Sequence, residues 1–218
     1  MFNNWNSSTN GEVQFFNRIK NEISTIFDVG CRSDTEFTEF EGIVHYFDPV
    51  ESFIRELSSK PNKNSKSYYN TFGLGNENTT SYYYPRYQSF FNRINSCKGD
   101  DSASKVELKI RKAKDYIIEN NINKIDFLKI DTEGFELNVI KGFEELISNV
   151  GIIQFEYGGT FLDNNTKLID VINYLKEHGF ENFSYLSIDG TSPITDFSDH
   201  YQYCNIVCIN KNSTFRPF

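Results

Sequence analysis

The sequence predicts an α/β fold in which a mostly parallel sheet is covered by helices on both faces. Three observations support this prediction. Short apolar runs alternate with stretches of helical period along the chain. The runs at 26–30, 43–48 and 126–131 end in a glycine or an acid, as expected where strands deliver site residues to one edge of a sheet. The last two strands follow each other without a helix, which adds one antiparallel strand.

The first third of the chain divides into strand–helix units. Apolar residues recur at helical spacing from Phe15 to Ile23, which predicts an amphipathic helix. Pro49 follows a strand and suits the first turn of a helix, where its missing N–H costs nothing. In order, we expect a helix at 13–24, a strand at 26–30, a short helix at 34–40, a strand at 43–48 and a helix at 49–57.

The middle of the chain is less regular. Two strands, 68–72 and 79–84, are expected on either side of a turn at 73–76. Residues 85–104 form an irregular run, and a loop of that length inside a compact domain is usually a lid, a binding loop or disordered. Residues 105–110 alternate polar and apolar side chains, which predicts a half-buried edge strand before a helix at 112–120.

The last part of the chain returns to regular alternation. The strand 126–131 precedes a helix with an apolar face from Val139 to Ile147, and Gly179 ends a later helix. In order, we expect a strand at 126–131, that helix, a strand at 152–157, a helix at 166–178, and strands at 183–188 and 203–209 joined by a loop at 189–199.

Length and composition predict one globular domain over residues 1–218, with the polar residues 1–12 flexible. Hydrophobic residues make up 38% of the chain, which rules out a disordered protein. The net charge of −8, without a basic block, argues against a nucleic-acid partner. The four cysteines form no Cys-x-x-Cys pair, so no metal site is expected. Because no apolar run approaches membrane-spanning length and residues 1–11 lack a signal-peptide pattern, we expect a cytoplasmic, soluble protein. A homodimer remains open.

Two strand ends suggest a nucleoside site. Asp28 and Gly30 end the strand 26–30, and a glycine at such a turn lets a ligand approach the backbone. Asp48 ends the next strand, about 20 residues on, where a carboxylate can accept both hydroxyls of a ribose. A lone acid at a strand end can also cap the following helix. The sequence leaves both roles of Asp48 open, although its spacing from Gly30 favours a nucleoside.

Together these segments resemble the FkbM-type S-adenosylmethionine-dependent methyltransferases. The most distinctive match is the central strand and its turn, residues 125–136, and the matches run in the family's order from about residue 25 to 210. The resemblance implies a Rossmann-like class I methyltransferase fold, with a seven-stranded, mostly parallel sheet containing one antiparallel strand and an extra hairpin or loop over the site. The matching segments are 26–30 (IFDVG), 44–49 (VHYFDP), 73–76 (GLGN), 125–136 (IDFLKIDTEGFE), 153–157 (IQFEY) and 204–207 (CNIV).

The resemblance also implies roles for individual residues around S-adenosylmethionine. Asp131 would face the sulfonium and the methyl acceptor. The first loop, residues 30–34 (GCRSD), departs from the family because it lacks a second glycine, and Arg32 could pair with a cofactor carboxylate or with Asp34. The implied cofactor residues are Asp28, Gly30, Cys31 and Arg32 for the methionine part, Asp48 and Pro49 for the ribose, and Gly75 and Asn76 for the adenine.

Methyl transfer to a hydroxyl needs a general base within hydrogen-bonding reach of the acceptor. Asp131 and Glu133 are the first candidates, and Glu156, at a neighbouring strand end, is the third. Crowded carboxylates raise one another's pKa, which would make one of them a better base near neutral pH. Two alternatives remain: Asp131 binds only the cofactor's amino group, or Glu133 only begins the next helix.

Candidate acceptor contacts come from two segments. Arg86 and Tyr87 lie in an aromatic stretch whose flat rings could stack on sugars, although such rings can equally pack in the core. Tyr157 and Gly158 end the strand beside the predicted site. The sequence therefore predicts an S-adenosylmethionine-dependent O-methyltransferase acting on a saccharide hydroxyl. The alternative is an inactive methyltransferase-like module that binds cofactor or glycan, which the altered first loop motivates.

Overall fold

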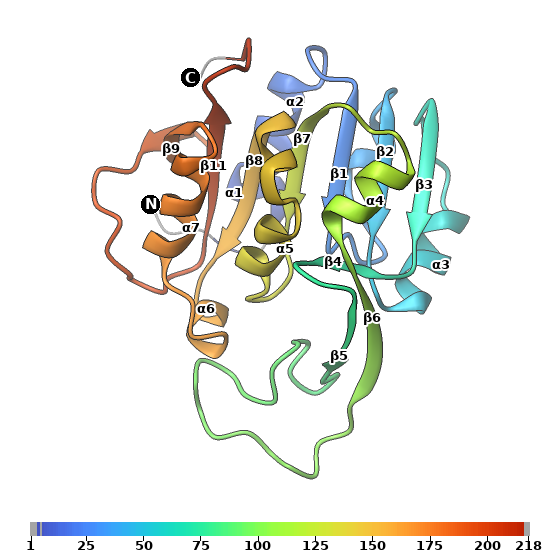
Figure 1. Cartoon of the computed structure of the whole chain (residues 1–218), viewed down its shortest axis with the longest axis vertical. Coiled ribbons are helices and arrows are strands. Elements are labelled where there is room, and N and C mark those ends of the chain that lie inside the picture. The colour runs from blue at the N-terminus through green and yellow to red at the C-terminus, as the bar shows by residue number, and fades with distance from the viewer. Residues whose placement is uncertain (1–3, 5, 216–218) are drawn as a thin grey trace.

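The computed structural model describes residues 4 and 6–215 of the chain. Its centre is an eight-stranded sheet in the order β10-β9-β11-β8-β7-β1-β2-β3 (Figure 1). The strands are β1 (Thr25–Val29), β2 (Ile43–Phe47), β3 (Lys66–Asn70), β7 (Ile125–Ile130), β8 (Val150–Tyr157), β9 (Phe180–Ser187), β10 (Gly190–Pro193) and β11 (Cys204–Asn210).

The directions of the strands confirm the predicted mostly parallel sheet. β1 runs parallel to β2 and β7, β2 to β3, and β7 to β8. β11 lies antiparallel between β8 and β9, as predicted for the last strand. β10 adds an eighth strand at the edge, within a segment that the sequence predicted to be a loop. Because β10 is antiparallel to β9, the sheet has two reversed strands instead of the one predicted. The parallel strands bring the carboxyl ends of β1, β2, β7 and β8 to one edge.

Helices cover both faces of the sheet, as predicted. Strand residues alternate between the two faces: Ile26 and Phe127 pack in one apolar cluster, and Phe27 and Leu128 pack in the other. The first cluster lies under α2, η1 and α3, and the second under α4, α5 and α7 (Figure 1). The helices are α1 (Ser7–Asn10), α2 (Glu12–Ile19), η1 (Glu36–Glu39), α3 (Glu51–Ser59), α4 (Ala113–Glu119), α5 (Glu136–Gly142), η2 (Glu144–Asn149), α6 (Thr160–Asp163) and α7 (Leu168–Glu177).

The N-terminal segment that the sequence predicted to be flexible is partly ordered in the structure. Residues 1–3 and 5 lie outside the described residues. Ser7–Asn10 form α1, and Asn10 is fully buried with its side-chain amide bonded to Glu12. The longest described helix, α7, has 10 residues, and no described helix is both long and apolar enough to span a bilayer.

A second, three-stranded sheet corrects two predictions. It has the order β4-β6-β5, built from β4 (Gly73–Gly75), β5 (Thr79–Tyr83) and β6 (Val106–Lys112). Residues 73–75 are therefore a strand and not a turn, and β6 is the central strand and not an edge. Close approach explains the glycines of β4, because a Cβ on Gly75 would lie 2.6 Å from the Ile110 side chain. The β5–β6 connection, residues 84–105, is called the covering loop below.

Candidate active site

The loops after β1 and β7 meet because their strands are neighbours in register. Val29 pairs with Phe47 on one side and with Ile130 on the other. Gly30 has φ +85° and donates its N–H to the Phe47 carbonyl at 2.8 Å. A Cβ on Gly30 would lie 1.8 Å from the Asp131 carbonyl oxygen. Only glycine allows the first loop to pass this close to the tip of β7.

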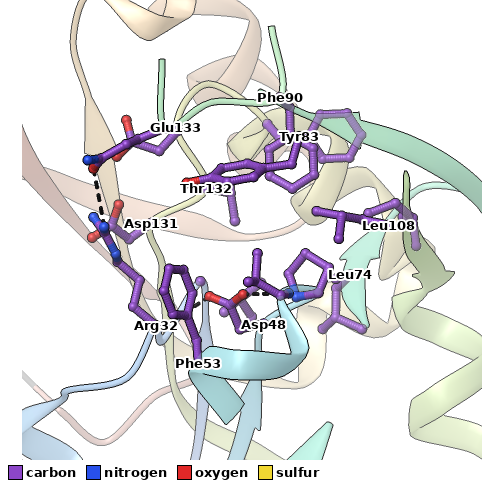
Figure 2. Close-up of a pocket in the computed structure, with 18 residues that line it drawn as sticks. Arg32, Asp48, Phe53, Leu74, Tyr83, Phe90, Leu108, Asp131, Thr132 and Glu133 are labelled. Atoms are coloured by element: carbon purple, nitrogen blue, oxygen red, sulfur yellow. Dashed lines mark hydrogen bonds between the residues drawn. The ribbon is translucent and has the colours of Figure 1, made fainter. Parts of the chain in front are cut away.

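These tips open into a cleft between the main sheet and the small sheet, called the aromatic cleft below. Figure 2 shows Asp48 and Phe53 on one side of it, with Tyr83 and Phe90 opposite. Phe90 stacks on Phe135, with ring centroids 5.6 Å apart and planes at 21°. The cleft is lined by Val29, Gly30, Arg32, Asp48, Pro49, Val50, Phe53, Gly73, Leu74, Tyr83, Gln88, Phe90, Leu108, Ile110, Asp131, Thr132, Glu133 and Phe135.

Asp48 is held rigidly at the edge of this cleft. Its side-chain oxygens accept the backbone N–H of Arg32 at 3.0 Å and that of Val50 at 2.8 Å. The bond from Val50 closes a turn just before α3, whose N-cap residue is Val50 and which has no side-chain cap hydrogen bond, so the helix-cap role that the sequence left open is not found. A carboxylate offers about four lone-pair sites, so two remain for a ligand's hydroxyls. Burial raises the pKa of Asp48 to about 6, against the two backbone hydrogen bonds, which lower it.

Two predicted cofactor residues lie below the cleft instead of lining it. Asp28 and Cys31 are buried, with exposed fractions of 0% and 3%. Burial raises the pKa of Asp28 to about 7, although the Lys129 ammonium and the Thr35 hydroxyl act in the opposite direction. Burial also raises the pKa of the Cys31 thiol, and the charges of Asp28 and Asp48 add to the effect.

The predicted adenine residues Gly75 and Asn76 are not among the residues that line the aromatic cleft. The carbonyl oxygen of Gly75 lies against α5, where a Cβ on Gly142 would approach it to 1.9 Å. The cleft receives Gly73 and Leu74 from the same strand. Sequence reasoning also missed Phe53, Tyr83 and Leu108 as cleft residues. Phe53 lies on α3, and the alternation of polar and apolar side chains on β6 could have indicated Leu108. Tyr83 reaches the cleft through the pairing of β5 with β6, which the sequence did not reveal.

A cluster of carboxylates surrounds the tip of β7. Asp131 and Glu133 line the aromatic cleft, and burial followed by the charges of Asp131 and Glu136 raises the pKa of Glu133 to about 7. Burial and the contact with Asp131 raise the pKa of Glu156 strongly. Glu133 has φ +54°, a strained conformation for a residue with a side chain, and it precedes α5 instead of beginning it.

Glu136 is the acid that begins α5, and sequence reasoning missed its role. Its Oε1 accepts the N–H groups of Thr132 and Gly134 and the Thr132 hydroxyl, at 2.9, 3.2 and 3.0 Å. Glu136 is 1% exposed, and burial raises its pKa to about 7. It holds the turn that presents Asp131 and Glu133.

A second cavity, called the acidic hollow below, adjoins the aromatic cleft. The two share Arg32, Asp131 and Glu133, so the tip of β7 faces both. The hollow measures about 510 Å³ and the cleft about 50 Å³. The hollow is lined by Ser7, Glu12, Arg32, Asp34, Glu36, Tyr87, Ser89, Arg93, Ile94, Asn95, Lys129, Asp131, Glu133, Glu156, Gly158, Gly159, Thr160, Asp163 and Tyr203.

The predicted acceptor residues divide between this hollow and other places. Tyr87 and Gly158 line the hollow. Arg86 instead pairs with Asp100 at 2.7 Å on the surface. Tyr157 is fully buried, and its hydroxyl accepts the backbone N–H of Tyr201 at 3.0 Å. The structure therefore brings only Tyr87 and Gly158 of these four to the hollow.

The covering loop closes over both cavities. Near the cleft, Arg32 donates to the Gln88 side chain at 3.2 Å. Near the hollow, the Arg93 guanidinium donates to the Asp163 carbonyl, and the backbone N–H of Ser96 donates to the Asp163 carboxylate. Small-molecule sites usually occupy about 300–1,000 Å³. The cleft, at about 50 Å³, is below this range, and the hollow, at about 510 Å³, is within it.

The described part of the chain contains no group of three or more His, Cys, Asp or Glu side chains arranged to hold an ion. His45 is 3% exposed and stacks on Tyr68 with ring centroids 4.2 Å apart. Burial lowers the pKa of His45 to about 4.

A comparison with known families decides the identity of this fold. The family profile of the methyltransferase FkbM domain matches residues 28–181, from the end of β1 into β9. The chain belongs to the FkbM methyltransferase family. This confirms the predicted family, and with it S-adenosylmethionine as the cofactor. Glu12 and the rest of the N-terminal segment lie outside the matched region.

Solved structures give more distant similarities. One is an S-adenosylmethionine-dependent O-methyltransferase from Thermotoga maritima, with 12% identity and a TM-score of 0.45, covering 95% of this chain. The chain spans 66% of the length of that protein. Another is the plantazolicin methyltransferase BpumL in complex with SAH, with 11% identity and a TM-score of 0.46, covering 91% of this chain and 80% of that one. No curated protein matches the chain.

The residues of this FkbM domain fit S-adenosylmethionine in their chemistry. The apolar and aromatic walls of the aromatic cleft suit adenine, and Asp48 retains free lone pairs for ribose hydroxyls. At the far end, Asp131 and Glu133 lie where a positively charged sulfonium would be stabilised. We expect the cofactor to lie along the cleft, from Asp48 toward Asp131.

Proposed function

We propose that this FkbM domain transfers a methyl group from S-adenosylmethionine to a hydroxyl group, and that the acceptor is a saccharide. The observation that carries the proposal is the position of Asp131 and Glu133. Both line the aromatic cleft and the acidic hollow, so they stand between a cofactor in one cavity and an acceptor in the other. A group at this junction can face the reacting carbon and the attacking oxygen together.

The cofactor supplies an electrophilic methyl group when bound. Asp131 is the proposed general base, since it lies at the junction and the Lys129 ammonium is 3.8 Å from its Oδ2. A nearby positive charge favours the ionised carboxylate that must accept the hydroxyl proton. Glu133, whose pKa is raised to about 7, is the second candidate. General-base catalysis of this kind typically contributes about 10²–10⁴-fold to the rate.

The lining of the acidic hollow supports a polyhydroxyl acceptor. Carboxylates such as Glu156 and Asp163 accept hydrogen bonds, Arg93 and the Asn95 amide donate them, and Tyr87 offers a ring face. A sugar presents hydroxyl donors and acceptors around an apolar ring face, which this mixture matches. The hollow, at about 510 Å³, is large enough for a small ligand.

The test is direct binding followed by a transfer screen. We expect calorimetry to detect binding of S-adenosylmethionine and S-adenosylhomocysteine to the full chain. Protein incubated with methyl-labelled cofactor and a panel of mono- and oligosaccharides should then transfer label to a hydroxyl, located by mass spectrometry of the product. Absence of cofactor binding would overturn the proposal. Cofactor binding with no transfer to any saccharide would favour the inactive binding module.

A further inference from the structure

The N-terminal helices reach the acidic hollow from outside the region that defines the family. Ser7 and Glu12 line the hollow together with Lys129 and Asp131 of the central strand, yet the family match begins at residue 28. Glu12 is the first residue of α2 and is only 5% exposed. Glu12 is therefore a buried acid at the hollow that comes from outside the matched region, and its contacts indicate its role.

Glu12 is held by a buried hydrogen-bond network. Its Oε1 accepts the Gln154 amide at 2.8 Å, and its Oε2 accepts the Asn10 amide at 2.7 Å. The backbone N–H of Glu12 donates to the Asn10 side-chain oxygen at 3.0 Å. These contacts leave the carboxylate little freedom, so its negative charge has a fixed position beneath the hollow.

Lys129 lies between this fixed charge and the proposed base. Its ammonium is 3.6 Å from Glu12 Oε1 and 3.8 Å from Asp131 Oδ2, and its side chain is 11% exposed. Burial disfavours the charged form of Lys129, but Glu12, Glu36 and Asp131 outweigh burial and raise its pKa well above the usual range. The three side chains Glu12, Lys129 and Asp131 therefore form a row of alternating charge. This row extends from α2 to the tip of β7.

We propose that Glu12 and Lys129 are positioning residues: Glu12 fixes the Lys129 ammonium under the acidic hollow, and this ammonium holds the Asp131 carboxylate directed toward the reacting methyl group. The proposal rests on the proposed function, since it takes Asp131 as the base that faces the sulfonium. It makes the N-terminal segment part of the active site.

Other charged groups face this row from the elements around it. Arg32 approaches from the loop after β1 and acts on Glu133. The acids that surround Lys129 and Asp131 are Asp28 from β1, Glu36 from η1, Glu133 and Glu136 from the turn and start of α5, and Glu156 from β8. Because these groups titrate together, the experiment must measure the pH at which the whole carboxylate cluster is half protonated, and not the pKa of one residue.

The experiment compares two ligands that differ in charge at the reacting atom. S-adenosylmethionine carries a sulfonium and S-adenosylhomocysteine a neutral sulfur, so the ratio of their dissociation constants reports the charge around Asp131. Calorimetry from pH 5 to pH 8 gives the pH at which the preference for the sulfonium is half lost. The variants are Lys129→Met, Lys129→Arg and Glu12→Gln. Lys124→Met is the control, because Lys124 is exposed at the other end of the same strand and pairs with Asp126.

Lys129→Met and Glu12→Gln should both shift this midpoint upward. Removing the positive charge in Lys129→Met makes the cluster easier to protonate, so the midpoint rises by about 1 pH unit. Lys129→Arg should restore it toward wild type. Glu12→Gln releases the Lys129 ammonium from its fixed position, so the midpoint rises by a smaller amount, and Lys124→Met leaves it unchanged. If Lys129→Met fails to fold, the rise in Glu12→Gln still tests the proposal.

The outcomes separate this proposal from the proposed function. Wild-type protein that binds neither ligand would overturn the function itself. Wild-type binding with an unchanged midpoint in Lys129→Met and Glu12→Gln would overturn the positioning role alone. A lower midpoint in Glu12→Gln, or equal loss of affinity for both ligands at every pH, would show that Glu12 does not act through Lys129.

Discussion

The aromatic cleft and the acidic hollow meet at Asp131, but the chain builds them in different ways. The polar edge of the cleft is built from the ends of β1, β2 and β7, and its residue Asp48 is fixed by two backbone N–H groups. The hollow is assembled from side chains of segments far apart in sequence, such as Glu12, Asp163 and Tyr203. Backbone geometry therefore defines the cofactor side, and side-chain networks define the acceptor side.

This difference separates what the fold supplies from what the individual chain supplies. A site fixed by backbone hydrogen bonds tolerates many side chains around it, whereas a site built from distant side chains changes with each substitution. The family match covers β1, β2, β7 and β8 but not α2. We therefore expect substitutions at the junction to stop transfer, substitutions in the cleft to weaken cofactor binding, and substitutions in the hollow to alter the acceptor.

The largest effect should come from the junction itself. Asp131→Asn keeps the size of the side chain but cannot accept a proton, so we expect transfer to fall by at least about 10²-fold. Affinity for S-adenosylhomocysteine should stay within about threefold, because its neutral sulfur does not need the carboxylate. Turnover with the acceptor found by the saccharide screen, together with calorimetry, measures both quantities. Glu133→Gln is the matched comparison, and turnover retained in Asp131→Asn but lost in Glu133→Gln would move the base to Glu133.

The next effect tests whether Asp48 binds a ribose or only holds the turn before α3. Asp48→Asn retains an oxygen that can accept the Val50 N–H, but it lacks the charge that strengthens bonds from ligand hydroxyls. A hydrogen bond to a charged group is worth about 1.5–3 kcal/mol, so adenosine should bind about 10–100-fold more weakly. Binding of 2′,3′-dideoxyadenosine should change little. Equal losses for the two nucleosides would leave Asp48 with only its structural role in that turn.

Substituting one of two adjacent glycines, Gly158 and Gly159, by alanine tests how the covering loop is held, without changing the charge of the protein. A Cβ on Gly159 would lie 1.8 Å from the Asn95 side-chain oxygen, whereas a Cβ on Gly158 would make an ordinary contact, 3.5 Å from Tyr203. Gly159 has φ −61°, so alanine fits its backbone. Gly159→Ala should displace Asn95 and weaken the neighbouring bonds to Asp163, which are worth about 1 kcal/mol each.

Hydrogen exchange of residues 84–105 should therefore be faster in Gly159→Ala, and cofactor affinity should fall by roughly fivefold. Gly158→Ala should leave both close to wild type, because its Cβ displaces nothing. Identical behaviour of the two variants would show that the covering loop is not held at α6.

The sequence could predict the parts that depend on local periodicity. Strand ends carrying Gly30, Asp48 and Asp131 are visible in one dimension, and parallel pairing forces them to one edge. The same reasoning gave the reversed strand β11. These features follow from short-range patterns combined with one rule of sheet topology.

The rest depends on pairings between distant segments. β4 was predicted to be a turn because its glycines are turn residues, although they are present to let β4 approach β6 and α5. That Leu74 lines the cleft and Gly75 does not follows from that pairing. The contact of Glu12 with Lys129 joins residues 117 positions apart in the numbering (129 − 12), and no periodicity marks it. Long-range side-chain contacts therefore set the limit of the sequence prediction.

The smallest effect is the change of folding stability with pH, to which carboxyls around both the aromatic cleft and the acidic hollow contribute. In the folded protein the pKa values of Asp28, Glu133 and Glu136 are about 7 and that of Asp48 is about 6, whereas unfolded carboxyls titrate near pH 4. The folded state therefore holds protons that the unfolded chain has released, so stability is highest at low pH and is lost as the pH rises through about 6–7. His45 opposes this, since its lowered pKa costs stability below about pH 6.5.

Four carboxyls outweigh one histidine, so the ligand-free protein should melt a few degrees higher at pH 6 than at pH 7.5, because about 1 kcal/mol shifts a domain of this size by about 2–4 °C. Calorimetric scans at the two pH values measure the shift. Asp28→Asn should reduce it, since the amide cannot titrate, whereas Asn in place of the exposed Asp34 should not. A lower melting temperature at pH 6 would mean that the buried carboxyls are already ionised in the folded protein, and that the network around Lys129 supplies more compensating charge than its contacts with Glu12 and Asp131 indicate.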